Sequence, residues 1–269
     1  MLLPATEPLL DQKRRRPSLG LVGAGAFGQF CIPHLAPFFD LCICDDTPNV
    51  AVIAACHGVA SGDLERIAAQ DVIVLAVPLT ALRTVAEAIK PHLKPGALVI
   101  DVCSVKVKPL ALLRETLPGF VEIIGTHPLF GPQSGKNGIA GLPIAICGGE
   151  AREKLLVRFL REKLRLKVTR TTPEDHDRQM AHVQGLTHLI ARAIVAMDLP
   201  PLALATPTFG HLMRMVDTVR HDSEELFRTI AAENPFVAEV KREFQEAVAG
   251  TIARLEPNSS HTLHRHGRA

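Results

Sequence analysis

The chain has 269 residues, which is enough for one or two domains with a large buried core. Its 30 lysine and arginine residues nearly balance its 28 aspartate and glutamate residues, so charge gives no reason to expect nucleic acid or an acidic membrane as a partner. No apolar run reaches the ~18 residues that a membrane-spanning helix needs. The six cysteines show neither a Cys-x-x-Cys pair nor zinc-ligand spacing, so we expect no metal site and a reducing, cytoplasmic location.

Two terminal segments differ from the rest in composition. Residues 1–17 precede the first predicted strand and contain the basic run Lys13–Arg16, yet no charged segment precedes an apolar core as in a signal peptide. Residues 257–269 are polar. We therefore predict a flexible leader over 1–17 and a disordered tail over 257–269.

Between residues 18 and 171, short β-branched runs alternate with helical patterns. The runs are apolar on both faces, as in strands that helices cover on both sides. This alternation predicts an α/β domain with a Rossmann-type, doubly wound, mostly parallel sheet. The predicted strands are 19–22, 41–44, 72–77, 97–100, 121–124, 143–147 and 166–169.

A glycine-rich fingerprint, Gly23-Ala-Gly-Ala-Phe-Gly28, follows the first predicted strand and opens a helical stretch. Gly23 allows the tight turn, Gly25 lets the backbone approach a pyrophosphate, and Gly28 lets the helix pack on the strand. The amides at the start of the helix then favour phosphate binding. The predicted cofactor contacts here are Gly23, Gly25, Ala26, Phe27 and Gly28.

Two acidic residues, Asp45 and Asp46, end the second predicted strand at the spacing expected from the fingerprint. A carboxylate there accepts hydrogen bonds from a ribose 2′-hydroxyl and repels a 2′-phosphate, so NAD is favoured over NADP. The alternative is that these residues only begin a turn. Val77 and Pro78, at the end of a later strand, complete the predicted cofactor contacts.

Two polar loops are expected at the carboxyl ends of neighbouring strands, where ligands collect in open α/β sheets. One contains Ser104 and Lys106, and the other contains His127 and Ser134. Histidine titrates near neutral pH, so His127 could manage the hydroxyl proton in a dehydrogenase, with Ser104 orienting it. Taken alone, a loop histidine is more often structural.

After residue 171 the pattern is helical throughout, which predicts a second domain over 172–256. Thr172 reads as a helix N-cap, Pro173 as the first helical residue, and Asp175 as its capping-box partner. The helix that follows is apolar nearly all round, so we expect it to be buried and central. An apolar helical domain of this size also predicts a homodimer through the C-terminal helices.

Polar residues interrupt this apolar helix on one face. Asp177, Ala181, Gln184 and His188 are spaced by four, three and four residues, which aligns them. Buried polar groups need partners, and a bound substrate carboxylate would serve for Gln184 and His188. The alternative is that other parts of the protein satisfy them.

Three segments carry a resemblance to a known family. Asp101-Val-Cys-Ser-Val-Lys106, the run Thr126-His-Pro-Leu-Phe-Gly-Pro-Gln-Ser-Gly-Lys-Asn-Gly138, and Glu174-Asp-His-Asp-Arg178 with His188 resemble the prephenate/arogenate dehydrogenases of tyrosine biosynthesis. The resemblance extends from about residue 19 to 255 and looks closest to the compact plant-type arogenate enzymes. It implies a small-molecule substrate, arogenate or prephenate.

The resemblance implies an oxidative decarboxylation of a cyclohexadiene that bears a 4-hydroxyl and a ring carboxylate. His127 matches the catalytic histidine that accepts a hydrogen bond from the hydroxyl, and Ser104 matches the serine that bonds the same group. Gln184 and His188 match positions of the substrate pocket. Ser134 and Lys106, which lie inside the matching motifs, are further expected substrate contacts.

Substrate preference depends on another position, Asp222. In the family, an acidic residue there accompanies preference for arogenate, which carries an amino group where prephenate carries a keto group. The arginine that many prephenate enzymes place shortly before it has no clean counterpart, since Thr218 aligns with it and Arg220 is two residues away. We therefore expect L-arogenate as substrate, with prephenate or dual specificity as alternatives. Asp222 could also simply begin a capping box that ends at Glu225.

Two departures from the plant-type pattern stand out. Those relatives often use NADP, whereas this chain has Asp45 and Asp46, and Gln133 replaces a common glutamate. A hydroxy-acid dehydrogenase is a rival, but it would want a lysine in the helix over 172–197, which has none. A non-catalytic NAD-binding regulator on the same fold is the remaining alternative.

Overall fold

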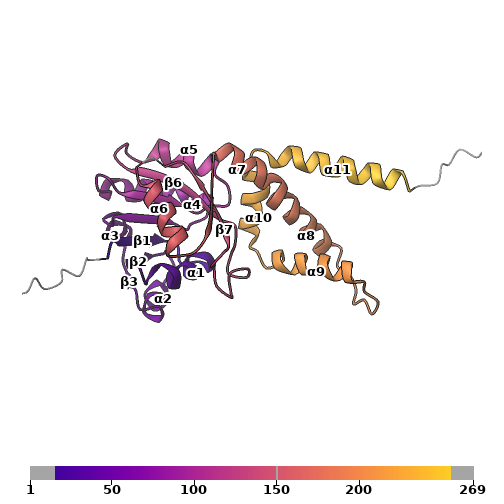
Figure 1. Ribbon diagram of the computed structural model, residues 1–269, viewed down its shortest axis with the longest axis horizontal. Coiled ribbons are helices and arrows are strands. Elements are labelled where there is room, and N and C mark those ends of the chain that lie inside the picture. Colours follow the sequence, from indigo (N-terminus) through magenta and orange to yellow (C-terminus); the bar gives the residue numbers. More distant parts are fainter. Residues whose placement is uncertain (1–15, 150, 256–269) are drawn as a thin grey trace, which may run out of the picture.

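The computed structural model describes residues 16–149 and 151–255 (Figure 1). Most of the predicted leader over 1–17 and all of the predicted tail over 257–269 therefore lie outside the described residues. Arg16 and Pro17 are the described part of the leader, and the Arg16 guanidinium donates to the Ala36 carbonyl at 3.2 Å.

The described residues form an eight-stranded sheet with the order β3-β2-β1-β4-β5-β6-β7-β8. All neighbouring strands are parallel except β6 and β7, which are antiparallel. The predicted doubly wound, mostly parallel sheet is thus confirmed. The strands are β1 Ser18–Val22, β2 Asp40–Cys44, β3 Ala60–Ser61, β4 Val72–Leu75, β5 Leu98–Asp101, β6 Glu122–Pro128, β7 Pro143–Cys147 and β8 Lys167–Thr171.

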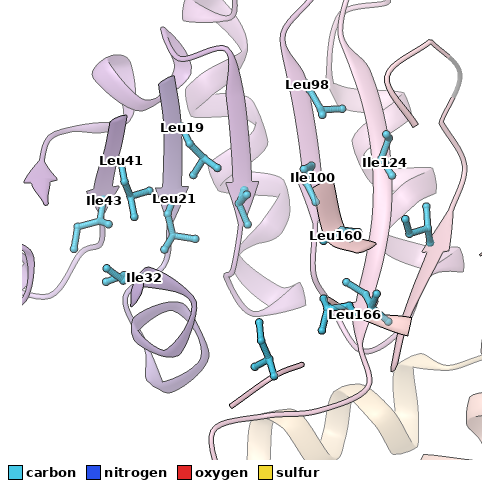
Figure 2. Packing of buried hydrophobic residues seen from close by; sticks show 14 of the residues in the cluster. Leu19, Leu21, Ile32, Leu41, Ile43, Leu98, Ile100, Ile124, Leu160 and Leu166 are labelled. Carbon is cyan, nitrogen blue, oxygen red and sulfur yellow. The ribbon is translucent and has the colours of Figure 1, made fainter. Parts of the chain in front are cut away.

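Helices cover both faces of this sheet (Figure 1). Buried side chains of α1, α2 and α6 pack on one face, and those of α3, α4 and α5 pack on the other. Figure 2 shows the first cluster, in which Leu19, Leu21 and Ile32 lie on one side and Ile100, Ile124 and Leu160 on the other. The helices are α1 Ala26–Leu35, α2 Val50–Cys56, α3 Leu64–Ala68, α4 Leu79–Ile89 with the 3₁₀ turn η1 Lys90–His92, α5 Val107–Thr116 and α6 Glu153–Glu162.

The antiparallel β7 corrects the expectation for the His127 segment. Strand β6 continues to Pro128, so His127 lies within a strand and opposite Ala145, not in a loop. The reason is that β7 returns beside the end of β6 and supplies backbone partners there. The short strand β3 was not predicted, because two residues carry no alternating pattern.

Past Thr171 the described chain is helical. The elements are α7 Pro173–Met180, the π-helical segment η2 Ala181–Leu186, α8 Thr187–Ala196, α9 Pro207–Val219, α10 Glu224–Arg228, the π-helical segment η3 Thr229–Glu233 and α11 Val237–Ala253. Thr172 caps α7 by accepting from the Asp175 backbone N–H at 3.1 Å, as predicted. The Asp175 carboxylate pairs with Arg178 at 3.0 Å.

The long helix made of α7, η2 and α8 is less buried than predicted. It extends away from the sheet with α9 and α11 beside it (Figure 1), and the Val183 and Met197 side chains are 60% and 66% exposed. The prediction of a buried central helix is therefore wrong for the single chain, because α9 and α11 cover part of its apolar surface and leave the rest open. Among the described residues, no helix is long and apolar enough to cross a membrane.

Candidate active site

A chain of three buried side chains links strand β6 to helix α7. His127 Nδ1 lies 2.9 Å from His176 Nε2, and His176 Nδ1 lies 2.7 Å from Asp177 Oδ1. The three residues are 3%, 2% and 0% exposed, so water does not compete for these hydrogen bonds. The two imidazole rings meet edge to face, with centroids 5.0 Å apart.

The start of helix α5 anchors this chain at its carboxylate end. Asp177 Oδ1 accepts from the Lys106 backbone N–H at 2.7 Å, and Oδ2 accepts from that of Val107 at 2.9 Å. The Asn234 side-chain amide donates to the Asp177 carbonyl at 2.7 Å. A carboxylate held by donors on every side has no proton to give, so the neighbouring His176 must be the donor in their shared bond.

This direction fixes the tautomers of both histidines. A singly protonated His176 that donates from Nδ1 to Asp177 has an acceptor at Nε2, and His127 Nδ1 then donates to it. The other ring nitrogen of His127, Nε2, then carries a lone pair. The structure therefore presents His127 as a base whose reactive nitrogen is defined by residues behind it.

The surroundings also keep His127 uncharged. Burial lowers its pKa well below the usual 6.5, and the neighbouring His176 ring and Lys106 ammonium group lower it further. A neutral imidazole at neutral pH can accept a proton or a hydrogen bond from a hydroxyl. This is the property that the sequence analysis required of His127.

The predicted helix residues reach the free face of His127. Gln184 Nε2 lies 3.4 Å from His127 Nε2, at the long end of hydrogen bonding. One turn further along, His188 Nε2 lies 3.8 Å from Asp222 Oδ2. The structure thus brings His127, Gln184, His188 and Asp222, from three parts of the sequence, into one row.

Asp222 does not cap a helix, contrary to the alternative considered above. The cap of α10 is Ser223, whose Oγ accepts from the Leu226 backbone N–H at 3.1 Å. The Asp222 carboxylate is thereby left to face His188. Burial raises its pKa, whereas the neighbouring His188, Arg192 and His221 lower it by less.

Two predicted contacts have surroundings other than those expected. Lys106 is fully buried, and its Nζ pairs with Asp101 and donates to the Thr126 carbonyl at 2.7 Å, so it is a structural residue and not a substrate contact. Ser134 is exposed, and its Oγ accepts from the Gly131 backbone N–H at 3.0 Å within its own turn. Ser104, by contrast, lies where it was predicted: it is half-buried in the loop after β5, and β5 is the neighbour of β6, which carries His127.

The glycine fingerprint has the shape of a phosphate cradle. Gly23 has a φ of +100°, and its N–H donates to the Cys44 carbonyl at 2.8 Å. A Cβ on Gly28 would lie 1.9 Å from the Gly23 carbonyl oxygen, whereas a Cβ on Gly25 would meet nothing within 4 Å. The open side at Gly25, at the uncapped start of α1 where Ala26 and Phe27 begin the helix, fits a pyrophosphate.

Asp45 closes the cradle from the end of β2. Its carboxylate accepts from the Ala24 backbone N–H at 2.5 Å and from that of Thr47 at 2.8 Å. The turn-forming role considered above is therefore real for Asp45, and it ties the fingerprint to β2. Asp46 is exposed beside it, and Val77 and Pro78 lead from β4 into α4.

Comparison with known proteins agrees with this geometry. A model of the prephenate dehydrogenase nucleotide-binding domain matches residues 43–165, and a model of the dimerization domain of prephenate dehydrogenase matches residues 172–268. The chain belongs to the prephenate dehydrogenase family.

Curated relatives include enzymes named for either substrate. Arogenate dehydrogenase 1 of Arabidopsis thaliana is 29% identical over 265 residues, which cover 92% of this chain and 41% of that protein. A probable arogenate/prephenate dehydrogenase of Methanocaldococcus jannaschii is 26% identical over 186 residues, which cover 65% of this chain and 41% of that protein. The chain spans less than half the length of these relatives.

Solved structures share the fold. The arogenate dehydrogenase of Synechocystis superposes with a TM-score of 0.67 and 21% identity, covering 88% of this chain and 91% of that one. The prephenate dehydrogenase of Aquifex aeolicus, in complex with hydroxyphenyl propionate and NAD+, gives a TM-score of 0.71 and 20% identity, covering 90% and 93%.

Sequence reasoning used the segment from Glu174 to Arg178 for the resemblance, yet it assigned no role to His176. Adjacent residues on a helix point about 100° apart, so nothing in the spacing indicated that His176 would reach His127 while Asp177 reached α5. The available signal was two titratable residues side by side in the first turns of a well-capped helix. Their partners lie 49 and 71 residues away and become visible only in the folded chain.

Proposed function

We propose that the chain catalyses the oxidative decarboxylation of L-arogenate to L-tyrosine, with NAD preferred as the hydride acceptor. The observation that carries the proposal is the buried chain Asp177–His176–His127, whose free nitrogen faces a row of polar helix residues that leads to Asp222. At one end of this row, His127 can accept a hydrogen bond from the 4-hydroxyl of arogenate. At the other end, the Asp222 carboxylate has the charge that complements the ammonium group.

His127 would act on the 4-hydroxyl. Its Nε2 accepts the hydroxyl hydrogen bond at the place where Gln184 Nε2 now approaches, and Ser104 is a further contact for the same hydroxyl. Withdrawal of the proton toward His127 stabilises the positive charge that develops at C4 as a hydride leaves. The electron pair of the breaking C1–carboxylate bond restores aromaticity as CO2 departs, and the shared proton remains with the phenol.

A bound nicotinamide supplies the acceptor for that hydride. Gly23, Gly25 and Gly28 would hold the pyrophosphate, together with the first amides of α1. Asp45 and Asp46 support NAD over NADP, because a 2′-phosphate would meet two carboxylates at the end of β2.

Asp222 supports arogenate over prephenate. Its carboxylate is half-buried, makes no cap and lies 3.8 Å from His188 Nε2. An α-ammonium group would pair with it, whereas a keto group would leave a desolvated negative charge without a partner. Prephenate specificity or dual specificity are the competing outcomes.

Steady-state kinetics with both substrates, each crossed against NAD and NADP, test the proposal. We expect the highest kcat/KM for arogenate with NAD. A higher kcat/KM for prephenate would reject the substrate assignment. His127→Asn should lose turnover with cofactor affinity intact, whereas a non-catalytic regulator would have no turnover to lose.

We also propose a homodimer formed by the helical half. Exposed apolar side chains lie along α8, α9 and α11, among them Val195, Leu212 and Ile252, at 38%, 37% and 53% exposure. A second copy of the same surface would bury them. Sedimentation at micromolar concentration should give twice the monomer mass.

A cytoplasmic location, in keeping with six free cysteines, stays a prediction.

A further inference from the structure

Three buried polar atoms on one helix face have no hydrogen-bond partner among the described residues. They are Gln184 Oε1, His188 Nδ1 and Arg192 Nε. Residues spaced by four lie above one another on a helix, and eight residues span about 12 Å. Buried polar groups are almost always paired, so a row of unpaired ones indicates a ligand that completes them.

Arg192 was assigned no role from the sequence. Its guanidinium is fixed by three contacts: Nη2 donates to the Asp222 carbonyl at 3.0 Å, Nη1 pairs with Glu224 at 3.2 Å, and the group lies 5.0 Å from the Phe227 ring centroid. These contacts use the outer nitrogens. The inner N–H, on Nε, is buried and remains to donate.

The positions at which the sequence analysis looked for a carboxylate-binding arginine do not supply one. Thr218 is exposed and donates to the Arg214 carbonyl at 2.9 Å, one turn back on its own helix. Arg220 is exposed and pairs with Asp217 at 3.1 Å. Arg192 instead reaches the Asp222 segment from α8.

A donor and an acceptor of opposite charge thus sit side by side at this end of the row. The Arg192 guanidinium contacts the backbone of Asp222, whose carboxylate faces His188 at 3.8 Å. An α-amino acid carries its carboxylate and its ammonium on one carbon, in the complementary arrangement. A keto acid would satisfy Arg192 and leave Asp222 unpaired.

We propose that Arg192 Nε donates to the side-chain carboxylate of the substrate, beside the ammonium that the proposed function pairs with Asp222. This assignment rests on the proposed function, since it requires the hydroxyl end of the same molecule to lie at His127. It makes Arg192 a specificity-determining residue.

Three phenols that differ in one charged group each test the two halves separately. L-Tyrosine has both groups, 3-(4-hydroxyphenyl)propionate has the carboxylate alone, and tyramine has the ammonium alone. Their dissociation constants are measured by calorimetry on the NAD-loaded protein. Loss of a charged hydrogen bond should weaken binding about 10- to 100-fold.

Arg192→Gln should weaken L-tyrosine and the propionate and leave tyramine unchanged. Asp222→Asn should weaken L-tyrosine and tyramine and leave the propionate unchanged. Arg192→Lys keeps the charge but has no N–H at the position of Nε, so it should behave like Arg192→Gln. Glu224→Gln is the matched control, because it removes the exposed ion pair of Arg192 without touching Nε.

Two results would overturn the assignment. One is that Arg192→Gln and Arg192→Lys weaken all three phenols equally, or no more than Glu224→Gln does, which would make the arginine structural. The other is that wild-type protein binds L-tyrosine no more tightly than the propionate. Failure of the proposed function is distinct, since it would appear as wild-type protein that turns over prephenate in preference to arogenate.

Discussion

Replacing Asp177 by asparagine should invert the proton pattern of the whole buried chain, although it exchanges only one oxygen atom for an NH2 group. The carboxylate accepts from the Lys106 and Val107 backbone N–H groups and from His176. An asparagine amide must point its NH2 at one side. If it faces His176, that ring becomes the donor toward His127 Nδ1, and His127 then presents N–H in place of a lone pair at Nε2.

The structure allows the loss of stability and the loss of activity in Asp177→Asn to be estimated. A hydrogen bond to a charged group contributes about 1.5–3 kcal/mol, and the amide also leaves a buried backbone N–H facing another donor, so unfolding should become easier by about 2–4 kcal/mol. A histidine in the wrong tautomer cannot act as a base, so kcat should fall by about 10²–10⁴-fold. The dissociation constant of NAD should not change, since the hydrogen bonds of the Asp177 carboxylate go to His176 and to the start of α5 and not to the fingerprint.

The assay is kcat at saturating substrate and NAD, with urea unfolding of the same preparations. His176→Gln is the control, because its side-chain oxygen can accept from His127 Nδ1–H while its NH2 donates to Asp177, so it should retain far more activity than Asp177→Asn. Nitrogen-15 spectra of the His127 ring should show the proton on Nδ1 in wild-type protein and on Nε2 in Asp177→Asn. A folded Asp177→Asn variant with kcat within about threefold of wild type would refute the reasoning, because general-base loss costs far more.

Three other predictions follow from single features. Gly28→Ala should lower Tm, because the new Cβ would lie 1.9 Å from the Gly23 carbonyl oxygen. Gly25→Ala should keep the wild-type Tm but raise the Kd for NAD, since its Cβ would meet no protein atom within 4 Å. Unchanged NAD affinity in Gly25→Ala would reject the cradle assignment. Lys106→Met should lower the free energy of unfolding in urea by about 3–5 kcal/mol, because it leaves the buried Asp101 carboxylate without its ion-pair partner. Adding Asp101→Leu should restore part of that loss. Wild-type stability of Lys106→Met would contradict this prediction. The pKa of His127 is lowered on folding, so just below pH 6.5 the unfolded chain binds more protons than the folded chain does. The free energy of unfolding, and with it Tm, should therefore fall as the pH drops through that value. If Tm falls equally in His127→Asn, other groups cause the effect.

The secondary structure was largely predictable because local patterns carry it. Apolar β-branched runs gave the strands β1, β2, β4, β5, β6, β7 and β8 to within a few residues, and Thr172 capped α7 as expected. The direction of β7 was not predicted. It follows from a connection over 129–142 that holds no helix, since a parallel return needs a crossover and an antiparallel one does not.

Side-chain roles were predicted unevenly. His127 and Gln184 were assigned to one site, and they lie 3.4 Å apart because a strand end and a helix face place them there. Lys106 was assigned to substrate and proved to be buried against Asp101, and the cap considered as an alternative role for Asp222 is formed by Ser223. A sequence shows which residues could ionise or cap, but burial and competing donors decide which of them do.

The sequence by itself determined the doubly wound domain, its cofactor fingerprint and the histidine at the end of β6, since each depends on residues that are close along the chain. Only the tertiary structure decided how that histidine is held and what the far end of the site contains. His176, Asp177 and Arg192 each contact residues on other elements. Their hydrogen-bond partners and unpaired atoms are therefore defined only when those elements are packed together.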